Sequence, residues 1–319
     1  MLKFIVRRFV WTIPVLLLVV FFTFVMMRQI KGNPFQVTER AVPASIQRNL
    51  DRKYHLNKPW YTQYLYYVKG IAKFDLGPSL VQRNQTVNDI VKEHFPVSLK
   101  LGILAMIWAV LVGVPLGMLS ALKQNSITDY LTMVFVNSGS AVPNFLVSTL
   151  LIYFFAVKWR GWTHLPTNGW GDNGFWSLSD WKYWILPAAA LGHAPMTIFA
   201  RIVRGSVLET IQQDYIRTAK AKGLRWRRVV GLHILRNSLI PAVTAAAPLL
   251  GFLITGSFIV EFIFGLPGIG RYFVISVTSR DYSVTMGITV MLSAIIIAAN
   301  MVVDILYGFL DPRTRDART

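Results

Sequence analysis

Few residues in this chain have the types and spacing that chemistry requires, and a segment bounded by two glycines comes nearest. Residues 265–272 read Gly-Leu-Pro-Gly-Ile-Gly-Arg-Tyr, which approaches the phosphate-binding pattern G-x-x-x-x-G-K-[ST]. In that pattern the Lys reaches phosphate and the hydroxyl binds Mg²⁺, whereas Arg271 and Tyr272 occupy those positions here. No strand is predicted before Gly265. The sequence therefore predicts no nucleotide site in this chain.

Other kinds of catalytic or metal site are not indicated. The absence of cysteine excludes disulfides, thiolate ligands and cysteine nucleophiles. The five histidines, at positions 55, 94, 164, 193 and 233, lack the spacing of metal ligands, and we expect His193 to pack in the interior. Neither H-E-x-x-H nor G-x-S-x-G occurs, which disfavours a membrane-embedded hydrolase. We expect no metal, cofactor or catalysis in this chain.

The elements that position these residues are apolar and long. The chain is 54% hydrophobic and only 15% charged, where soluble domains carry about 25% charged residues. A helix needs about 20 apolar residues to cross a bilayer core, and six stretches without Asp, Glu, Lys or Arg approach or exceed that length. They are Phe9–Met27, Leu101–Leu122, Tyr130–Val157, Tyr183–Ala200, Ser238–Val260 and Tyr282–Val303. The sequence predicts an all-α integral membrane protein with six transmembrane helices.

The first apolar stretch has a second interpretation, a cleaved signal peptide, because three basic residues precede it. It is longer than the roughly 7–15 residues of a signal-peptide core, and no A-x-A cleavage site follows it. We expect a retained first helix.

Basic residues give the chain a net charge of +18, and they gather beside the predicted spans, at residues 1–8, 201–236 and after 311. Short loops rich in Lys and Arg stay in the cytoplasm, whereas loops longer than about 60 residues cross largely regardless of charge. The sequence predicts that both termini are inside and that the long loop after the first span is outside. It does not indicate a nucleic-acid-binding surface.

The predicted spans divide the chain into three regions: residues 1–28, the N-terminus and first span; 29–97, an external loop domain; and 98–319, a transmembrane domain with a cytoplasmic loop at 201–237. Within the external loop domain, a single helical stripe is apolar or aromatic, which predicts a helix near the membrane interface. The stripe consists of Trp60, Tyr64, Val68 and Ile71. A second external segment, 159–184, contains six Trp and is expected to be compact.

The loop at 201–237 is too long for a hairpin turn. Within it, residues 214–222 (DYIRTAKAK) predict a short helix that begins at an acidic residue, ends in basic residues and is followed by Gly223 at the C-cap position. A second helix, 226–237, is predicted to lead into the next span at Pro241.

This loop resembles the "EAA" loop of binding-protein-dependent ABC importer permeases, in the dipeptide, oligopeptide and nickel branch. The resemblance rests on DYIRTAKAKGLR at 214–225 and HILRNSLIP at 233–241. It implies a coupling helix that docks into a groove on an ATPase subunit, with small residues at the contact and a glycine where the backbone turns. The expected coupling residues are Asp214, Tyr215, Arg217, Thr218, Ala219, Lys220, Ala221 and Gly223. The alternative is a basic membrane anchor without a docking role.

Nearly the whole chain shows the same resemblance, including DLGPS at 75–79, EFIFGLPGIG at 261–270 and RDY at 280–282. It implies the type I ABC importer permease fold. The second of these segments is similar to the family's external loop between the last two spans, and the residues that carry it are Glu261, Gly265, Pro267, Gly268 and Gly270. The chain departs from the general pattern at Arg217, which replaces the Glu of E-A-A, a basic variant that is common in this branch. Oligopeptide permease subunits look most similar.

Polar residues inside the predicted spans are candidates for the translocation pathway. In the third span they are Asn137, Ser140 and Asn144, beside Pro143; helix packing through small residues is an equally good explanation. In the last span Asp304 shares one helical face with Asn300, Tyr307 and Asp311. That face could line the pathway, but we favour a structural pairing of its carboxylates with Arg201 or Arg204.

The sequence therefore predicts a permease subunit without catalysis of its own, in the bacterial cytoplasmic (inner) membrane. The resemblance implies a homologous second permease, two ABC ATPases that bind ATP and Mg²⁺, and an external binding protein that delivers the substrate. The cargo stays open between oligopeptide, dipeptide and nickel. A secondary transporter or channel that works alone is the alternative, but it would not need the cytoplasmic loop.

Overall fold

The structure is a computed structural model that describes residues 2–29, 58–82, 84–171 and 177–310. The chain divides into two compact units, one of residues 1–98 with 267–319 and one of residues 99–266. Helix α4 (Val87–Leu122) contributes its first turns to the first unit and the rest to the second. The described residues are almost entirely helical, in agreement with the all-α prediction.

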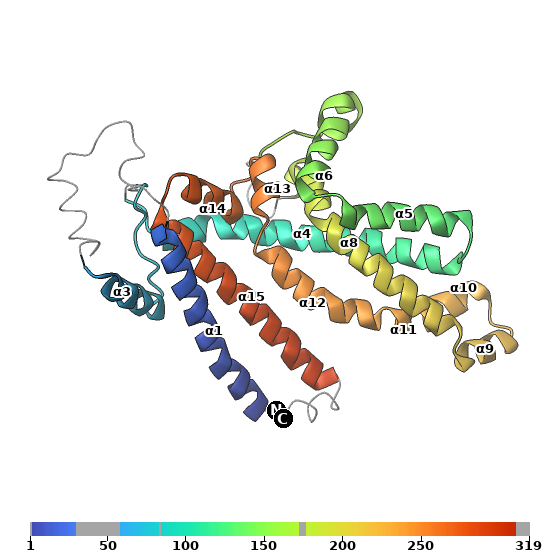
Figure 1. The fold of residues 1–319 in the computed structure, drawn as a ribbon. Coiled ribbons are helices and arrows are strands. Elements are labelled where there is room, and N and C mark those ends of the chain that lie inside the picture. Colours follow the sequence, from blue (N-terminus) through green and yellow to red (C-terminus); the bar gives the residue numbers. More distant parts are fainter. Residues whose placement is uncertain (1, 30–57, 83, 172–176, 311–319) are drawn as a thin grey trace. The chain divides into compact units, whose positions relative to one another are not determined.

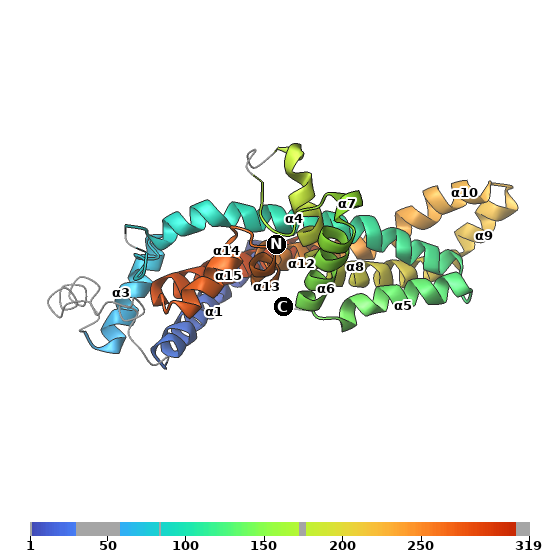
Figure 2. The same ribbon diagram turned by 90° about the horizontal axis from the view of Figure 1, so that it is seen from above.

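The first unit contains two long membrane helices, α1 (Leu2–Gln29) and α15 (Tyr282–Leu310), which lie side by side in both views (Figures 1 and 2). Helix α14 (Ile269–Thr278) packs against α15. Helix α3 (Trp60–Ala72), which the apolar stripe predicted, packs against α1. The core of this unit is formed by Val87, Ile90, Ile269, Val284, Ile288 and Leu292.

The second unit is built around helix α8 (Trp181–Ile211). Most side chains from Trp184 to Ala200 are buried, as expected for a helix that is covered on all sides. The C-terminal part of α4, α5 (Ile127–Ala141), α6 (Asn144–Leu151) and α12 (Ile240–Ile254) surround it (Figure 1). The shorter elements are η2 (Ile152–Lys158), α7 (Arg160–Thr163), η3 (Leu178–Asp180), α9 (Asp214–Ala221), α10 (Trp226–Arg228), η4 (Val229–Leu235), α11 (Arg236–Ser238) and α13 (Phe258–Ile263).

Glycines allow the backbones of this unit to approach closely. A Cβ atom at Gly113 of α4 would lie 2.6 Å from the carbonyl oxygen of Met196 in α8, and one at Gly192 of α8 would lie 2.5 Å from that of Ala105 in α4. A Cβ atom at Gly102 of α4 would lie 2.6 Å from the carbonyl oxygen of Leu253 in α12. Lipid is as apolar as the side chains, so packing at close range is a main source of helix association in a membrane.

The third predicted span, 130–157, is not one helix. It is divided into α5 and a second segment, 144–158, with a bend of 114° between them. Val142, which precedes Pro143, is extended at φ −94° and ψ 124°, because a proline disfavours helical geometry in the residue before it. The segment 226–238 and α12 form a second bent pair, at 45°.

By length and composition, four described helices are able to cross a membrane, and six spans result if each bent pair is one span. The chain is therefore a multi-pass membrane protein.

The substitution Gly113→Ala is expected to destabilise the second unit. The added methyl group would clash with the Met196 carbonyl and push α4 away from α8. Overpacking of this kind costs about 1–3 kcal/mol. Gly205 in α8 is the matched control, since a Cβ there meets no atom within 4 Å. Gly205→Ala should leave stability unchanged or raise it by up to about 1 kcal/mol through helix propensity. Thermal unfolding of the two purified variants in detergent measures the difference, and equal midpoints would contradict the packing argument.

Candidate functional site

The predicted coupling helix is present as α9, which forms a compact substructure with α10, η4 and α11. Both views show α9 and α10 at the end of α8 where the turn between α4 and α5 also lies (Figures 1 and 2). The inner side of α9 buries Ile216 and Ala219, which belong to the same cluster as Val229 and Ile234 of η4. The helix is therefore held by its own apolar face.

The outer side of α9 is polar and exposed. Thr218 donates a hydrogen bond to the Asp214 carbonyl at 3.0 Å, and Arg217 lies 3.6 Å from the Asp214 carboxylate. The Lys220 ammonium stands 4.6 Å from the centre of the Trp226 ring. Of the expected coupling residues, only Ala219 is buried within the chain; the exposed ones are Asp214, Tyr215, Arg217, Thr218, Lys220, Ala221 and Gly223.

Gly223 ends this helix in the left-handed region, with φ +75°. Its N–H bonds to the Lys220 carbonyl at 3.0 Å, and the next residue, Leu224, donates to the Ala219 carbonyl at 3.3 Å. Side chains other than glycine rarely adopt such a φ, whatever the space around them. The C-cap itself is Lys222, one residue before the predicted position, and the backbone turns from α9 toward α10 at Gly223.

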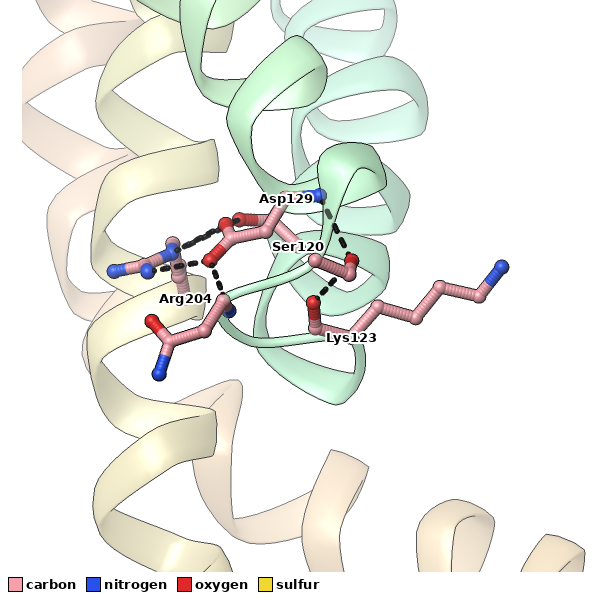
Figure 3. Close-up of polar contacts among 6 residues, drawn as sticks. Ser120, Lys123, Asp129 and Arg204 are labelled. Atoms are coloured by element: carbon pink, nitrogen blue, oxygen red, sulfur yellow. Dashed lines mark hydrogen bonds and ion pairs between the residues drawn. The ribbon is translucent and has the colours of Figure 1, made fainter.

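A buried ion pair lies at the same end of the second unit, and it was not predicted (Figure 3). Arg204 of α8 donates through Nε and Nη2 to the two oxygens of Asp129 in α5, at 3.1 and 3.0 Å. Ser120 of α4 accepts from Arg204 Nε at 2.9 Å and donates to Asp129. The Asp129 side chain is only 5% exposed, and that of Arg204 is 27% exposed. Side chains from α4, α5 and α8 are thus joined in one network.

Arg204 is thus engaged by Asp129, and the expected pairing of the acidic face of the last span with Arg201 or Arg204 stays a prediction. Asp304 lies within α15, but its side chain is outside the described residues, as is Asp311. The sequence contained one usable signal: Ser126-Ile-Thr-Asp129 has capping-box spacing. In the structure Ser126 caps α5 by accepting from the Asp129 N–H at 3.3 Å, and the Asp129 carboxylate accepts from the Asn125 N–H at 3.1 Å.

Four of the five residues predicted for the pathway lie at or near the break between α5 and α6; the fifth, Asp304, lies in α15. Asn137, Ser140 and Pro143 are exposed on the surface of the chain, and Asn144 is half-buried. The Ser140 hydroxyl donates to the Asn137 carbonyl at 3.0 Å. Polar side chains exposed at mid-span are expected to face water or another protein rather than lipid.

Helix α8 packs against this break in the core of the second unit. His193 is buried, with Nδ1 2.7 Å from the Ala190 carbonyl and Nε2 3.3 Å from that of Val142. Thr197 donates to the Val136 carbonyl at 2.6 Å. His193 is thus a packing and hydrogen-bonding residue, and the described part of the chain contains no group of three or more His, Cys, Asp or Glu residues that could hold a metal ion.

The expected external-loop residues are divided between the two units. In the second unit Glu261 is fully buried in the first turn of α13, and Gly265 turns the chain at φ +61°. In the first unit Gly268 is the N-cap of α14 and Gly270 is buried. The Pro267 carbonyl accepts from His94 of α4 at 2.9 Å.

The Trp-rich segment is held to α4 by a cation. The buried Lys100 ammonium lies 3.1 Å from the centre of the Trp184 ring and 5.5 Å from that of Trp170. The Trp184 indole donates to the Trp170 carbonyl at 2.9 Å. Trp170 and Trp184 are thereby fixed to α4, whereas Trp162 of the same segment is 94% exposed.

Two motifs of the first unit that are 200 residues apart meet at a carboxylate. Asp281 accepts from the Ser79 hydroxyl and from the N–H groups of Leu80 and Val81, both at 3.2 Å. It also accepts from the N–H of Val284 at 3.2 Å, which caps α15. The loop before α4 is thereby fixed to the start of α15, a contact that neither motif revealed by itself.

The amino-acid sequence matches a known protein family. Residues 113–316 match the family described as binding-protein-dependent transport system inner membrane component, and residues 1–102 match its N-terminal region. The chain is 43% identical to the oligopeptide transport system permease protein OppB of Haemophilus influenzae, over 99% of this chain and 100% of that protein. It is 42% identical to the dipeptide transport system permease protein DppB of Bacillus subtilis, over 99% and 98%.

A solved structure shows the same fold. The crystal structure of an amino acid ABC transporter with histidines superposes with a TM-score of 0.52 at 15% identity, covering 69% of this chain and 93% of that one. At this level of identity the likeness concerns the fold alone.

Replacing Asp129 with Asn should destabilise the second unit by about 3 kcal/mol, because the Arg204 charge would be left without its partner in a largely buried site. Asp214→Asn is the matched control: its contact with Arg217 is almost fully exposed, and exposed pairs contribute little. Thermal unfolding of both variants in detergent gives the comparison. A loss at Asp129 no larger than that at Asp214 would mean that the network contributes nothing to stability.

Proposed function

Because the chain belongs to the binding-protein-dependent transport system inner membrane component family, we propose that it forms one half of the translocation pathway of an ATP-driven peptide importer. The observation that carries this proposal is the similarity to oligopeptide and dipeptide permeases over practically the full length of both chains. The proposed cargo is a peptide, and nickel becomes the less favoured choice.

The proposed topology has six spans, with each bent pair crossing once, and both termini in the cytoplasm. The charge pattern supports this arrangement, because the loop at 201–237 carries nine basic residues and two acidic ones. Residues 1–28 are then the N-terminus and first span, 29–97 the external loop domain and 98–319 the remaining transmembrane domain. The proposed location is the cytoplasmic membrane of a bacterium.

The proposed partners follow from the same membership. A homologous permease forms the other half of the pathway, two ABC ATPases bind ATP and Mg²⁺ in the cytoplasm, and an external binding protein delivers the peptide. The polar residues near the α5–α6 break, Asn137, Ser140 and Asn144, are proposed to face the pathway together with Pro143, and Asp304 is proposed as a further pathway residue. A transporter that works alone would not need the exposed α9.

The proposed coupling contact is the outer side of α9. Its centre is Thr218, flanked by Arg217, Ala221 and Gly223, all exposed. Ala219 takes part indirectly, because its burial against η4 fixes the position of the helix. Helix α9 is held in place by its apolar contacts with η4. Small exposed side chains on such a helix suit a close fit into a groove of another protein.

Thr218→Trp is expected to prevent docking without unfolding the subunit. The side chain is exposed, so a bulky ring there meets only the partner, whereas Ala219→Trp would disrupt the chain's own core. In reconstituted vesicles Thr218→Trp should lose peptide uptake and substrate-stimulated ATP hydrolysis together, with unfolding temperature and peptide capture by the binding protein unchanged. Full transport by this variant would refute the assignment of α9 as the coupling helix.

Gly223→Val tests the turn after α9. A Cβ meets no atom within 4 Å at Gly223 or at Gly231 of η4, but only Gly223 has positive φ. A β-branched residue is strongly disfavoured at such a φ, so Gly223→Val should misdirect α9 and reduce ATPase stimulation at least severalfold, while Gly231→Val retains it. Equal activity of the two variants would show that the left-handed turn is not required.

A further inference from the structure

Helix α3 exposes several large apolar and aromatic side chains in its first two turns. Its first two turns carry Trp60, Tyr61, Leu65 and Tyr66, which are between 50% and 64% exposed. None of the residues of α3 is buried. No charged residue occurs from Pro59 to Val68. Such a continuous apolar face is unusual on a surface in contact with water.

The contacts of Tyr64, which lies between Trp60 and Tyr61 around the helix axis, show the level in the membrane at which α3 lies. The Tyr64 ring packs edge-on against Phe21 and Phe24 of α1, with centroids 5.7 and 5.6 Å apart. Its hydroxyl donates to the carbonyl of Leu17 at 3.3 Å. All three partners are inside the apolar span of α1, Val10–Met27.

These contacts place α3 beside the span and not beyond its end. Leu17 is ten residues before Met27, which at 1.5 Å per residue is about 15 Å, or half the thickness of a bilayer core of about 30 Å. Phe21 and Phe24 lie nearer to that end. Even allowing for the length of a tyrosine side chain, the backbone of α3 lies alongside the last turns of the span.

The exposed face of α3 continues the lipid-facing surface of α1. Helix α1 exposes Leu18, Phe22 and Met26 by 55–66%, as a membrane helix does toward acyl chains. Trp and Tyr are the side chains that membrane proteins concentrate near the bilayer surface. Exposed Lys69 and Lys73 follow the apolar turns, and their long side chains can reach the phosphate level while their stems stay in apolar surroundings.

We propose that α3 is inserted in one leaflet of the bilayer as a short additional membrane helix, with its exposed aromatic face against acyl chains. The occupant of this face is lipid and not a protein partner, because the face is continuous with the surface of a transmembrane helix at the same level. Only the identity of the leaflet, the outer one, depends on the topology proposed above. The segment 29–97 then includes a membrane anchor that clamps the end of α1.

The natural absence of cysteine allows a direct test with single nitroxide labels in the assembled transporter in phospholipid vesicles. Leu65→Cys probes the proposed face. Phe22→Cys on α1 serves as the lipid reference, and Gln85→Cys, in the exposed loop before α4, as the aqueous reference. Collision rates with oxygen, which concentrates in lipid, are compared with those of a water-soluble nickel chelate.

The label at Leu65 should resemble that at Phe22, with oxygen collisions exceeding those of the chelate, and the label at Gln85 should show the reverse. A Leu65 label that resembles Gln85 overturns the proposal in favour of an aqueous external helix. A label that neither reagent reaches also overturns it, in favour of a protein partner. The readout does not depend on transport, so a failure of the proposed function would be seen separately in uptake.

Discussion

A membrane helix that breaks exposes backbone groups that lipid cannot satisfy, and the second unit is organised around that constraint. At the α5–α6 break the Val142 N–H still finds the Ser138 carbonyl, at 3.0 Å. The Val142 carbonyl, which has no helical partner beyond Pro143, is met by His193 of α8. Six residues before Val142 in α5, the Val136 carbonyl accepts from the Thr197 hydroxyl of α8. Helix α8, which lies directly against the broken span, therefore stabilises it.

Close approach between α5 and α8 follows from small residues at the contact. A Cβ atom at Gly139 of α5 would lie 3.2 Å from the His193 carbonyl oxygen. A larger residue there would separate the helices and leave the Val142 carbonyl out of reach of His193. Gly113 and Gly192 likewise allow the backbones of α4 and α8 to approach closely. The polar contacts at the break and the glycine positions are thus parts of one packing solution.

The sequence was informative where the determinant is local. Apolar stretches located the membrane helices, and Gly223 marked a turn because the required φ excludes most other residues. It was less informative where the determinant is a distant contact. Pro143 indicated a kink, but not a bend of 114°, because the angle depends on α8. The contact of Arg204 with Asp129, 75 residues earlier, was not predicted, since nothing local relates the two residues. The burial of Ala219 depends on η4, which the local pattern of α9 does not describe.

Helices α5 and α8 are joined at three levels, and this determines which segments of the second unit can move. The contacts are Arg204 with Asp129 near one end, Thr197 with Val136 in the middle, and His193 with Val142 at the break. From Arg204 to His193 is about 16 Å along α8 at 1.5 Å per residue. Two helices tied at both ends of such a distance cannot slide without breaking a buried polar contact, which costs several times the thermal energy.

A point at which the chain can move therefore lies outside the α5–α8 pair. The short turn between α8 and α9, where Gln212 and Gln213 are exposed, is such a point. A displacement of α9 that pulls on α8 must carry α5 with it and change the geometry at the break. Under the proposed function, the contact with the ATPase and the polar residues at the pathway are thereby linked through a rigid pair of helices, and no helix needs to unwind.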